Sequence, residues 1–155
     1  MTDYLIANAR IVNEGQRREA DVLIRKGRIE KIAPAIDAPS DVEVIDAEGR
    51  FLLPGMIDDQ VHFREPGLTA KADLASESRA AVAGGITSFM DMPNVKPPTV
   101  DHDAMVAKHA LAKGRCTANY GFHFGATNDN IEEIKKLDTR LSAGVKIFMG
   151  ASTGR

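Results

Sequence analysis

Hydrophobic residues in the first fifty positions fall in short runs, several of which alternate with polar residues. This spacing is typical of β-strands. It predicts strands over residues 4–12, 21–25, 28–32, 42–45 and 50–53. Lys26-Gly27 and Glu48-Gly49 lie between successive strands and predict tight turns, because glycine readily adopts positive φ. We therefore expect residues 1–53 to form a small all-β unit.

From Pro54 onward, segments of strand and helix length alternate, with glycine and proline at the joints. The pattern predicts four strands, at residues 55–58, 86–91, 118–124 and 144–149, and three helices, at residues 71–83, 101–113 and 129–137. Gly84-Gly85 and Gly114 would end the first two helices. Asp129 and Glu132 have the spacing of a capping box at the start of the third.

Strand–helix steps in succession are typical of a parallel α/β fold. An eight-stranded (β/α)8 TIM barrel usually has about 250 residues, so residues 54–155 correspond to about half of one. The chain ends at Arg155, after a strand and a small-residue loop, where the next helix should begin. We therefore expect an α/β fold that is the N-terminal half of such a barrel, and a chain that is a fragment.

Composition and charge narrow the function classes. The chain has 43% hydrophobic and 27% charged residues, as soluble globular proteins do. Its 20 Lys and Arg against 22 Asp and Glu give a net charge of −2, which gives no general attraction to nucleic acid or to a membrane surface. The single cysteine cannot form an internal disulfide, and neither a targeting segment nor an apolar run of about 18 residues is visible. We expect a cytoplasmic protein.

Polar side chains follow the predicted strands at the ends where parallel α/β folds keep their active sites. Asp58, Gln60 and His62 are spaced by two, so in a continuing strand they would share one face. Asn94 follows the next strand, although an asparagine after proline is also common in turns. Lys146 lies in an apolar run, where burial disfavours a charged amine, unless the ammonium extends to the strand end.

These motifs resemble the dihydroorotases of the amidohydrolase superfamily. The resembling segments, in chain order, are residues 54–58, 62–67, 83–87, 92–94 and 144–146. The resemblance implies a metal-dependent barrel that carries a small β-sandwich, with residues 1–53 as the N-terminal part of the sandwich. It also implies the reversible hydrolysis of L-dihydroorotate to N-carbamoyl-L-aspartate, by a metal-activated hydroxide, in pyrimidine biosynthesis.

The resemblance assigns a metal centre with one or two zinc ions. His62 corresponds to the second histidine of an Asp-x-His-x-His motif, and Asp58 to its leading aspartate. Gln60 stands in place of the first histidine, and a carboxamide oxygen is a weaker zinc ligand than an imidazole. Lys146 corresponds to a lysine that in many members is carbamylated and bridges two metals.

The same resemblance assigns substrate contacts. Arg64 and Asn94 correspond to the residues that bind the substrate α-carboxylate, and a guanidinium fits a carboxylate bidentately. The general base would follow a later strand, so we expect it beyond Arg155 and assign no catalytic residue within the chain.

Two classes of function stay open. The first is a cyclic amide hydrolase that acts on a small-molecule substrate as a homo-oligomer, with a hydantoinase or allantoinase as a related possibility. Arg64 favours the dihydroorotase type, because the substrates of those relatives lack the α-carboxylate. The second is a catalytically inactive dihydroorotase-like subunit that assembles with aspartate transcarbamoylase. Gln60 favours this second class, whereas the retained Arg64, Asn94 and Lys146 favour the enzyme.

Overall fold

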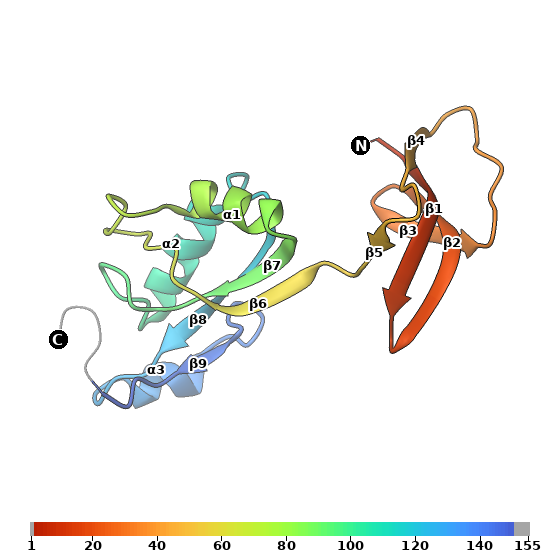
Figure 1. Cartoon of the computed structure of the whole chain (residues 1–155). Helices are drawn as coiled ribbons and strands as arrows, with labels where there is room; N and C mark the ends of the chain where they lie inside the picture. Colours follow the sequence, from red (N-terminus) through yellow and green to blue (C-terminus); the bar gives the residue numbers. More distant parts are fainter. Residues whose placement is uncertain (1, 151–155) are drawn as a thin grey trace. The chain divides into compact units, whose positions relative to one another are not determined.

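The computed structural model describes residues 2–150, and the loop predicted at the end of the chain lies outside them. The chain divides into two compact units between Pro54 and Gly55 (Figure 1). Within residues 2–150, every helix is too short or too polar to cross a membrane.

The first unit is one five-stranded sheet built around its first strand. Antiparallel pairing joins β1 (Tyr4–Asn13) to β2 (Gln16–Arg25) and β2 to β3 (Arg28–Ala33). In contrast, β4 (Glu43–Asp46) and β5 (Phe51–Leu52) each pair with β1 in parallel. Four of the buried side chains of this unit form a small apolar cluster: Ala9, Ile11, Ala20 and Val22. The all-β prediction is confirmed, while the sandwich stays a prediction.

Tight turns of the first unit follow the expected glycine chemistry. Lys26-Gly27 has φ values of 51° and 72°, as a two-residue hairpin turn requires. Glu48-Gly49 also has positive φ, but it joins two strands that pair with β1 rather than with each other. A further turn at Glu14-Gly15, which we did not predict, makes β2 begin at Gln16 instead of at residue 21.

The second unit alternates parallel strands with helices. Its sheet has the order β6 (Met56–Val61), β7 (Ile86–Asp91), β8 (Asn119–Gly125) and β9 (Gly144–Lys146). The helices are α1 (Leu74–Ala83), α2 (His102–Ala112) and α3 (Ile131–Lys136). Figure 1 shows α1 and α2 on one side of the sheet, where α1 packs on β7 and α2 on β8. This is the order of consecutive strand–helix units in a TIM barrel, and the predicted fold class is confirmed.

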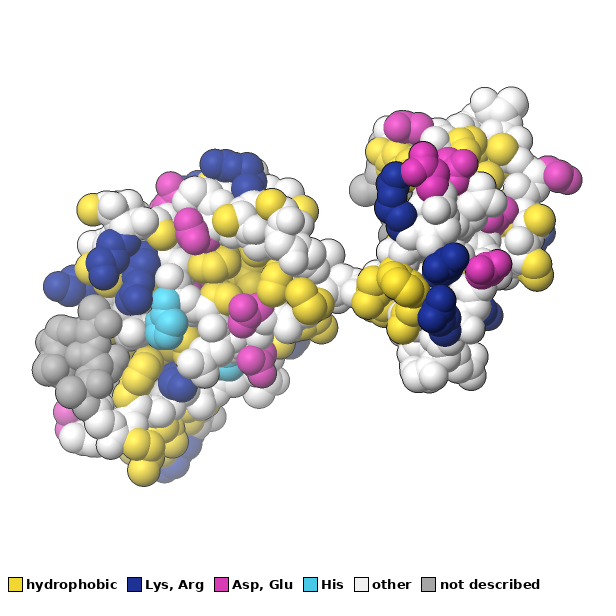
Figure 2. All heavy atoms as spheres, viewed as in Figure 1, with side chains coloured by type: hydrophobic (Ala, Val, Ile, Leu, Met, Phe, Trp, Pro, Cys, Tyr) yellow, Lys and Arg dark blue, Asp and Glu magenta, His cyan; other side chains and the backbone are white. Residues whose placement is uncertain are grey.

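An apolar core fills the space between the strands and these helices. Its buried members are Phe63, Leu74, Phe89, Met105, Ala112, Ala118, Phe122 and Phe124. The rings of Phe63 and Phe89 lie 4.5 Å apart between centroids. Other apolar side chains are exposed, as the space-filling view shows on each unit (Figure 2).

The opposite face of the sheet is concave. Alternation along β8 buries Phe122 and Phe124 in the core and places His123 on the other face. From there, His123 Nε2 lies 3.2 Å from the carbonyl oxygen of Asp59, on β6. Because β7 separates β6 from β8 in the sheet, this contact requires the sheet to curl, as the strands of a barrel do.

Some helix and strand ends differ from the prediction. Helix α1 begins at Leu74 rather than at residue 71, because Asp73 and Ser76 form a capping box. The capping box predicted at Asp129 and Glu132 is wrong. Asn130 is the N-cap of α3, without a side-chain cap bond, and its side chain instead donates to the carbonyl oxygens of Val100 and Gly125. Strand β9 ends at residue 146, not at 149.

Candidate active site

The strand that carries the predicted metal motif is irregular. The register between β6 and β7 shifts between Asp58 and Val61, and the backbone N–H of Gln60 donates to Asp58 Oδ1 at 3.1 Å. Such a bulge interrupts the alternation of side chains between the two faces. The expectation that Asp58, Gln60 and His62 share one face assumed regular alternation, and that assumption is wrong.

His62 and Asn94 meet at the carboxyl ends of β6 and β7. Their Nδ1 and Oδ1 atoms are 2.8 Å apart. A carboxamide oxygen only accepts hydrogen bonds, so Nδ1 is the donor in this contact, and in the neutral imidazole Nε2 then holds the lone pair. A histidine held through one ring nitrogen is oriented in the way that metal ligands are. The structure thus brings together two of the predicted site residues.

Arg64 lies two residues further along, in an unfavourable backbone conformation. Its φ is 67°, in the left-handed region that residues with a Cβ avoid. Contacts on either side hold it there. The N–H of Phe63 donates to Asp91 Oδ1 at 2.8 Å, and the buried Glu65 accepts hydrogen bonds from the Leu74 N–H and from Arg115. Strained residues held by their surroundings are concentrated at functional sites.

Glu65 also influences the protonation of its partner. The Glu65 carboxylate lies 2.8 Å from Arg115 Nη1, and this hydrogen bond raises the pKa of Arg115. The pair fixes the segment after β6 to the turn that follows α2, and the bond to Leu74 fixes it to the start of α1. We did not predict a role for Glu65.

The loops that follow β6 and β7 are docked on each other. The N–H of Lys96 donates to the carbonyl oxygen of Pro66 at 3.1 Å. Gly67 has a φ of 78°, and a Cβ at this position would lie 2.0 Å from the carbonyl oxygen of Lys96. Only glycine allows this approach. The docking keeps the Arg64 segment beside the loop that carries Asn94.

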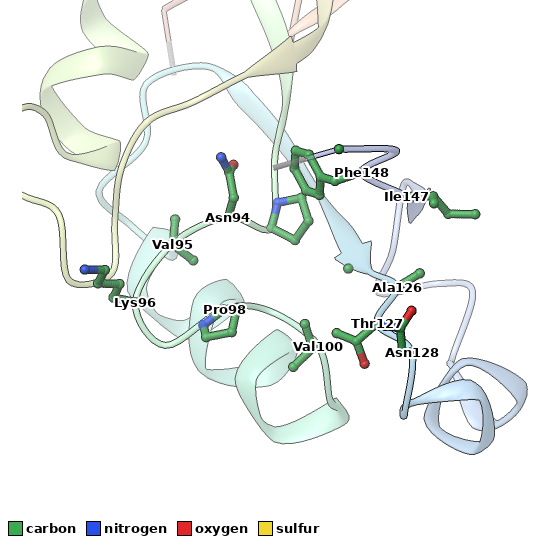
Figure 3. Close-up of a pocket in the computed structure, with 13 residues that line it drawn as sticks. Asn94, Val95, Lys96, Pro98, Val100, Ala126, Thr127, Asn128, Ile147 and Phe148 are labelled. Atoms are coloured by element: carbon green, nitrogen blue, oxygen red, sulfur yellow. The ribbon is translucent and has the colours of Figure 1, made fainter. Parts of the chain in front are cut away.

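A pocket of about 630 Å³ opens at the same ends of the strands. Figure 3 shows its lining residues, which come from the loops after β7, β8 and β9 and include Asn94, Lys96, Thr127, Asn128 and Phe148. The volume lies within the range of small-molecule sites, about 300–1,000 Å³. Asn94 therefore lines a pocket and also holds His62.

Lys146 lies at the end of β9, on the opposite edge of the sheet from β6. The side chain is half-buried, and its Nζ lies 5.3 Å from the centroid of the Phe148 ring. A cation over an aromatic face is a favourable arrangement. Among residues 2–150, no three His, Cys, Asp or Glu side chains are grouped so that they could hold a metal ion. Gln60 and Lys146 are of other residue types, so the metal centre predicted from His62, Asp58, Gln60 and Lys146 stays a prediction.

Two charged residues next to the site, Asp91 and Lys108, are buried, which we did not predict. Lys108 Nζ lies 2.7 Å from Asp91 Oδ2, and both side chains are fully buried. Burial lowers the pKa of Lys108, and the attraction of Asp91 opposes this. The helical spacing of Lys108 with Met105 and Ala112 could have indicated its burial, because all three lie on the buried face of α2. A paired partner would then be expected, since charged residues are rarely buried alone.

The parallel sheet, the helices on its outer side and the polar residues at the strand ends define a barrel-type α/β protein with its site at the carboxyl end of the sheet. Residues 51–154 match the model of the amidohydrolase family, and the chain belongs to that family. The predicted family resemblance is confirmed.

Relatives within this family carry different names. The chain is 42% identical over 155 residues to a dihydroorotase of Methanosarcina acetivorans, with 99% of this chain and 33% of the relative covered. It is 37% identical over 153 residues to an allantoinase of Solibacter usitatus, with 98% and 33% covered. The solved L-hydantoinase of Arthrobacter aurescens superposes with a TM-score of 0.88 at 32% identity, over 99% of this chain and 34% of that one. The chain thus spans about a third of the length of these relatives.

Proposed function

We propose that the protein containing this chain hydrolyses the ring amide of L-dihydroorotate reversibly to N-carbamoyl-L-aspartate, a reaction of pyrimidine biosynthesis. The observation that carries the proposal is the hydrogen-bonded pair of His62 and Asn94, with Arg64 two positions after His62 in the same segment. The pair sets an imidazole beside a carboxamide at adjoining strand ends, and Arg64 contributes a guanidinium to the segment that carries His62. These groups suit an anionic substrate with a polar ring.

Arg64 is the residue that selects the substrate in this proposal. Its guanidinium can donate two parallel hydrogen bonds, one to each oxygen of a carboxylate, and the opposite charges strengthen both bonds. The side-chain NH2 group of Asn94 can donate a further hydrogen bond to the same carboxylate. Dihydroorotate carries such an α-carboxylate, whereas hydantoin and allantoin do not, so a carboxylate-binding arginine favours the dihydroorotase type.

Some of the predicted ligands suit a zinc ion better than others. His62 would hold zinc through Nε2, because Nδ1 is engaged by Asn94. Lys146 would join as a carbamate, formed when its neutral amine adds to carbon dioxide and releases a proton, and a carbamate anion between cations is cheaper to bury than a lone ammonium. Gln60 offers only a neutral carboxamide oxygen. When bound, zinc supplies Lewis-acid activation of the amide carbonyl.

A substitution of Arg64 tests the substrate assignment in the full-length protein. Arg64→Met removes a charge-assisted contact, so kcat/KM for dihydroorotate should fall by about ten- to hundredfold, the equivalent of about 1.5–3 kcal/mol. Any turnover of hydantoin should stay unchanged. Arg79→Met, at an exposed position of α1, is the matched control. Unchanged dihydroorotate kinetics in Arg64→Met, or faster hydrolysis of allantoin than of dihydroorotate by the wild type, would contradict the proposal.

Gln60 favours a second candidate, an inactive dihydroorotase-like subunit that assembles with aspartate transcarbamoylase. A site with a weak ligand in place of a histidine would bind metal poorly. Metal analysis of the full-length wild-type protein, prepared without chelators, distinguishes the two. Bound zinc together with turnover supports the enzyme, and a metal-free protein with an unmodified Lys146 supports the subunit.

A further inference from the structure

A buried ion pair next to the candidate site joins α2 to the last residue of β7. Asp91 is the last residue of β7, Lys108 lies in α2, and the side chains of both are 0% exposed. Buried ion pairs contribute little net stability, because the loss of hydration offsets the attraction between the charges. A gain in stability therefore does not explain why a buried ion pair lies at this position.

The pair stands at the point where β6 and β7 separate. Val61 is in register with Asp91, and the N–H of Met92 donates to the carbonyl oxygen of Val61 at 2.9 Å. If the parallel ladder continued, the N–H of Phe63 would donate to the carbonyl oxygen of Met92. Instead, Phe63 donates to Asp91 Oδ1 at 2.8 Å, and Met92 accepts from Lys108 Nζ at 3.0 Å. The two charged side chains have replaced one bond of the ladder.

This replacement explains why the pair is ionic. Opening the ladder leaves one donor, the N–H of Phe63, and one acceptor, the carbonyl of Met92, in the buried interior. Buried backbone groups without partners are costly. A carboxylate supplies the acceptor, an ammonium supplies the donor, and each neutralises the other's charge. Apolar residues in place of Asp91 and Lys108 would leave both backbone groups unsatisfied.

We infer that Asp91 is a positioning residue for the segment of His62 and Arg64, with Lys108 as its internal counter-ion. Phe63 lies between these two site residues, so the bond to Asp91 fixes the peptide that orients both. The bond also precedes the left-handed backbone of Arg64, which needs an anchor because the conformation is unfavourable. The inference rests on the proposed function for the relevance of His62 and Arg64 to the reaction.

Two double variants of the full-length protein isolate this role. Asp91→Asn with Lys108→Met removes both charges and keeps an acceptor for the Phe63 N–H. Asp91→Leu with Lys108→Met removes the charges and the acceptor. The two side chains at position 91 are similar in size, so the variants differ chiefly in the hydrogen bond. Met105→Ala, at a fully buried position of the same helix, is a control for simple loss of core packing.

Amide hydrogen exchange of a peptide containing Phe63 is the first measurement. It should be about tenfold faster in the leucine variant than in the asparagine variant, which corresponds to the loss of one hydrogen bond of about 1.4 kcal/mol. The second measurement is the KM for dihydroorotate, which should rise in the leucine variant and stay close to the wild-type value in the asparagine variant. Met105→Ala should lower the unfolding temperature without raising KM.

Equal exchange at Phe63 in the two double variants would overturn the inference. A rise in KM that is as large in Met105→Ala would do the same, since it would show a general effect of stability. If the leucine variant does not fold, the single variant Asp91→Asn must keep wild-type exchange at Phe63, and faster exchange would contradict the positioning role. Exchange needs no substrate, so a wild-type protein without turnover would refute the proposed function and leave this test intact.

Discussion

At the scale of single residues, the candidate site depends on how two side chains are held. Asn94 Oδ1 accepts a hydrogen bond from Nδ1 of His62, and in the neutral imidazole this leaves Nε2 as the atom that can bind a metal. Arg64 keeps an unfavourable φ between two anchored neighbours, Phe63 and Glu65. The chemistry of the site therefore depends on hydrogen bonds from residues that would not touch the substrate.

Gln60 and Lys146 allow a residue-scale test of metal binding. If His62 binds zinc through Nε2, then Gln60→His adds a better ligand and should raise zinc affinity in the full-length protein by about tenfold or more. Lys146→Ala should abolish binding of a second ion, because it removes the bridging group. Titration with zinc in the presence of a competing chelator measures both.

A control for these variants is available in the first unit. Gln16→His places a histidine at an exposed position of β2 and should not change zinc affinity. In an inactive subunit, neither Gln60→His nor Lys146→Ala should change the function of the protein. Mass spectrometry of Lys146 under native conditions, before and after acid treatment, would show whether a carbamate is present.

At the scale of elements, the site depends on contacts between the loops that follow neighbouring strands. The loop after β6 docks on the loop after β7 through Pro66 and Lys96, and this contact has no room for a side chain at residue 67. The ion pair of Asp91 and Lys108 then ties the same strand ends to α2. The loops after β6 and β7 are therefore held both by each other and by helix α2.

Gly67 tests this docking. Gly67→Ala should force the two loops apart, because its Cβ would overlap the carbonyl oxygen of Lys96. We expect a loss of about 2 kcal/mol or more of unfolding free energy and a higher KM for dihydroorotate. Gly114→Ala is the matched control, since Gly114 has a φ of 72° but nothing within 4 Å of an added Cβ. It should cost only backbone strain, about 1–2 kcal/mol, with KM unchanged. Equal effects of the two substitutions in chemical denaturation and kinetics would contradict the docking role.

At the scale of the whole molecule, the sheet of the second unit is open within residues 2–150. Strands β6 and β9 are its edges, and apolar side chains on and next to them are exposed, including Met56, Ile57 and Val145. Unpaired strand edges and exposed apolar surface favour association with other chains. In a closed barrel, both would be covered.

Residues 1–155 expressed alone should therefore associate, and they should not hydrolyse dihydroorotate. Size-exclusion chromatography with light scattering measures the association, and a dihydroorotate assay measures the activity. The full-length protein is the control for both. A monodisperse monomer of residues 1–155 with cooperative unfolding and turnover would refute this prediction.

The sequence by itself determined the order of the elements, the turn at Lys26-Gly27 and the polar residues that follow the strands. These features are local: hydrophobic periodicity and the freedom of glycine act over a few residues and can be recognised without knowledge of the fold. The family followed from motifs that are equally local. For the same reason, an apparent capping box at Asp129 was misleading, because distant carbonyl groups compete for the side chain of Asn130.

Only the tertiary structure decided how the strand ends meet. The bulge in β6, the hydrogen bond from His62 to Asn94 and the exchange of a ladder bond for the Asp91 and Lys108 pair each join segments that are distant in sequence. Lys108 lies seventeen positions from Asp91, and nothing within one helical turn of either residue indicates the partner. Such pairs form because opening the ladder leaves buried backbone groups that must be satisfied, and that requirement exists only once the sheet and the helix have packed together.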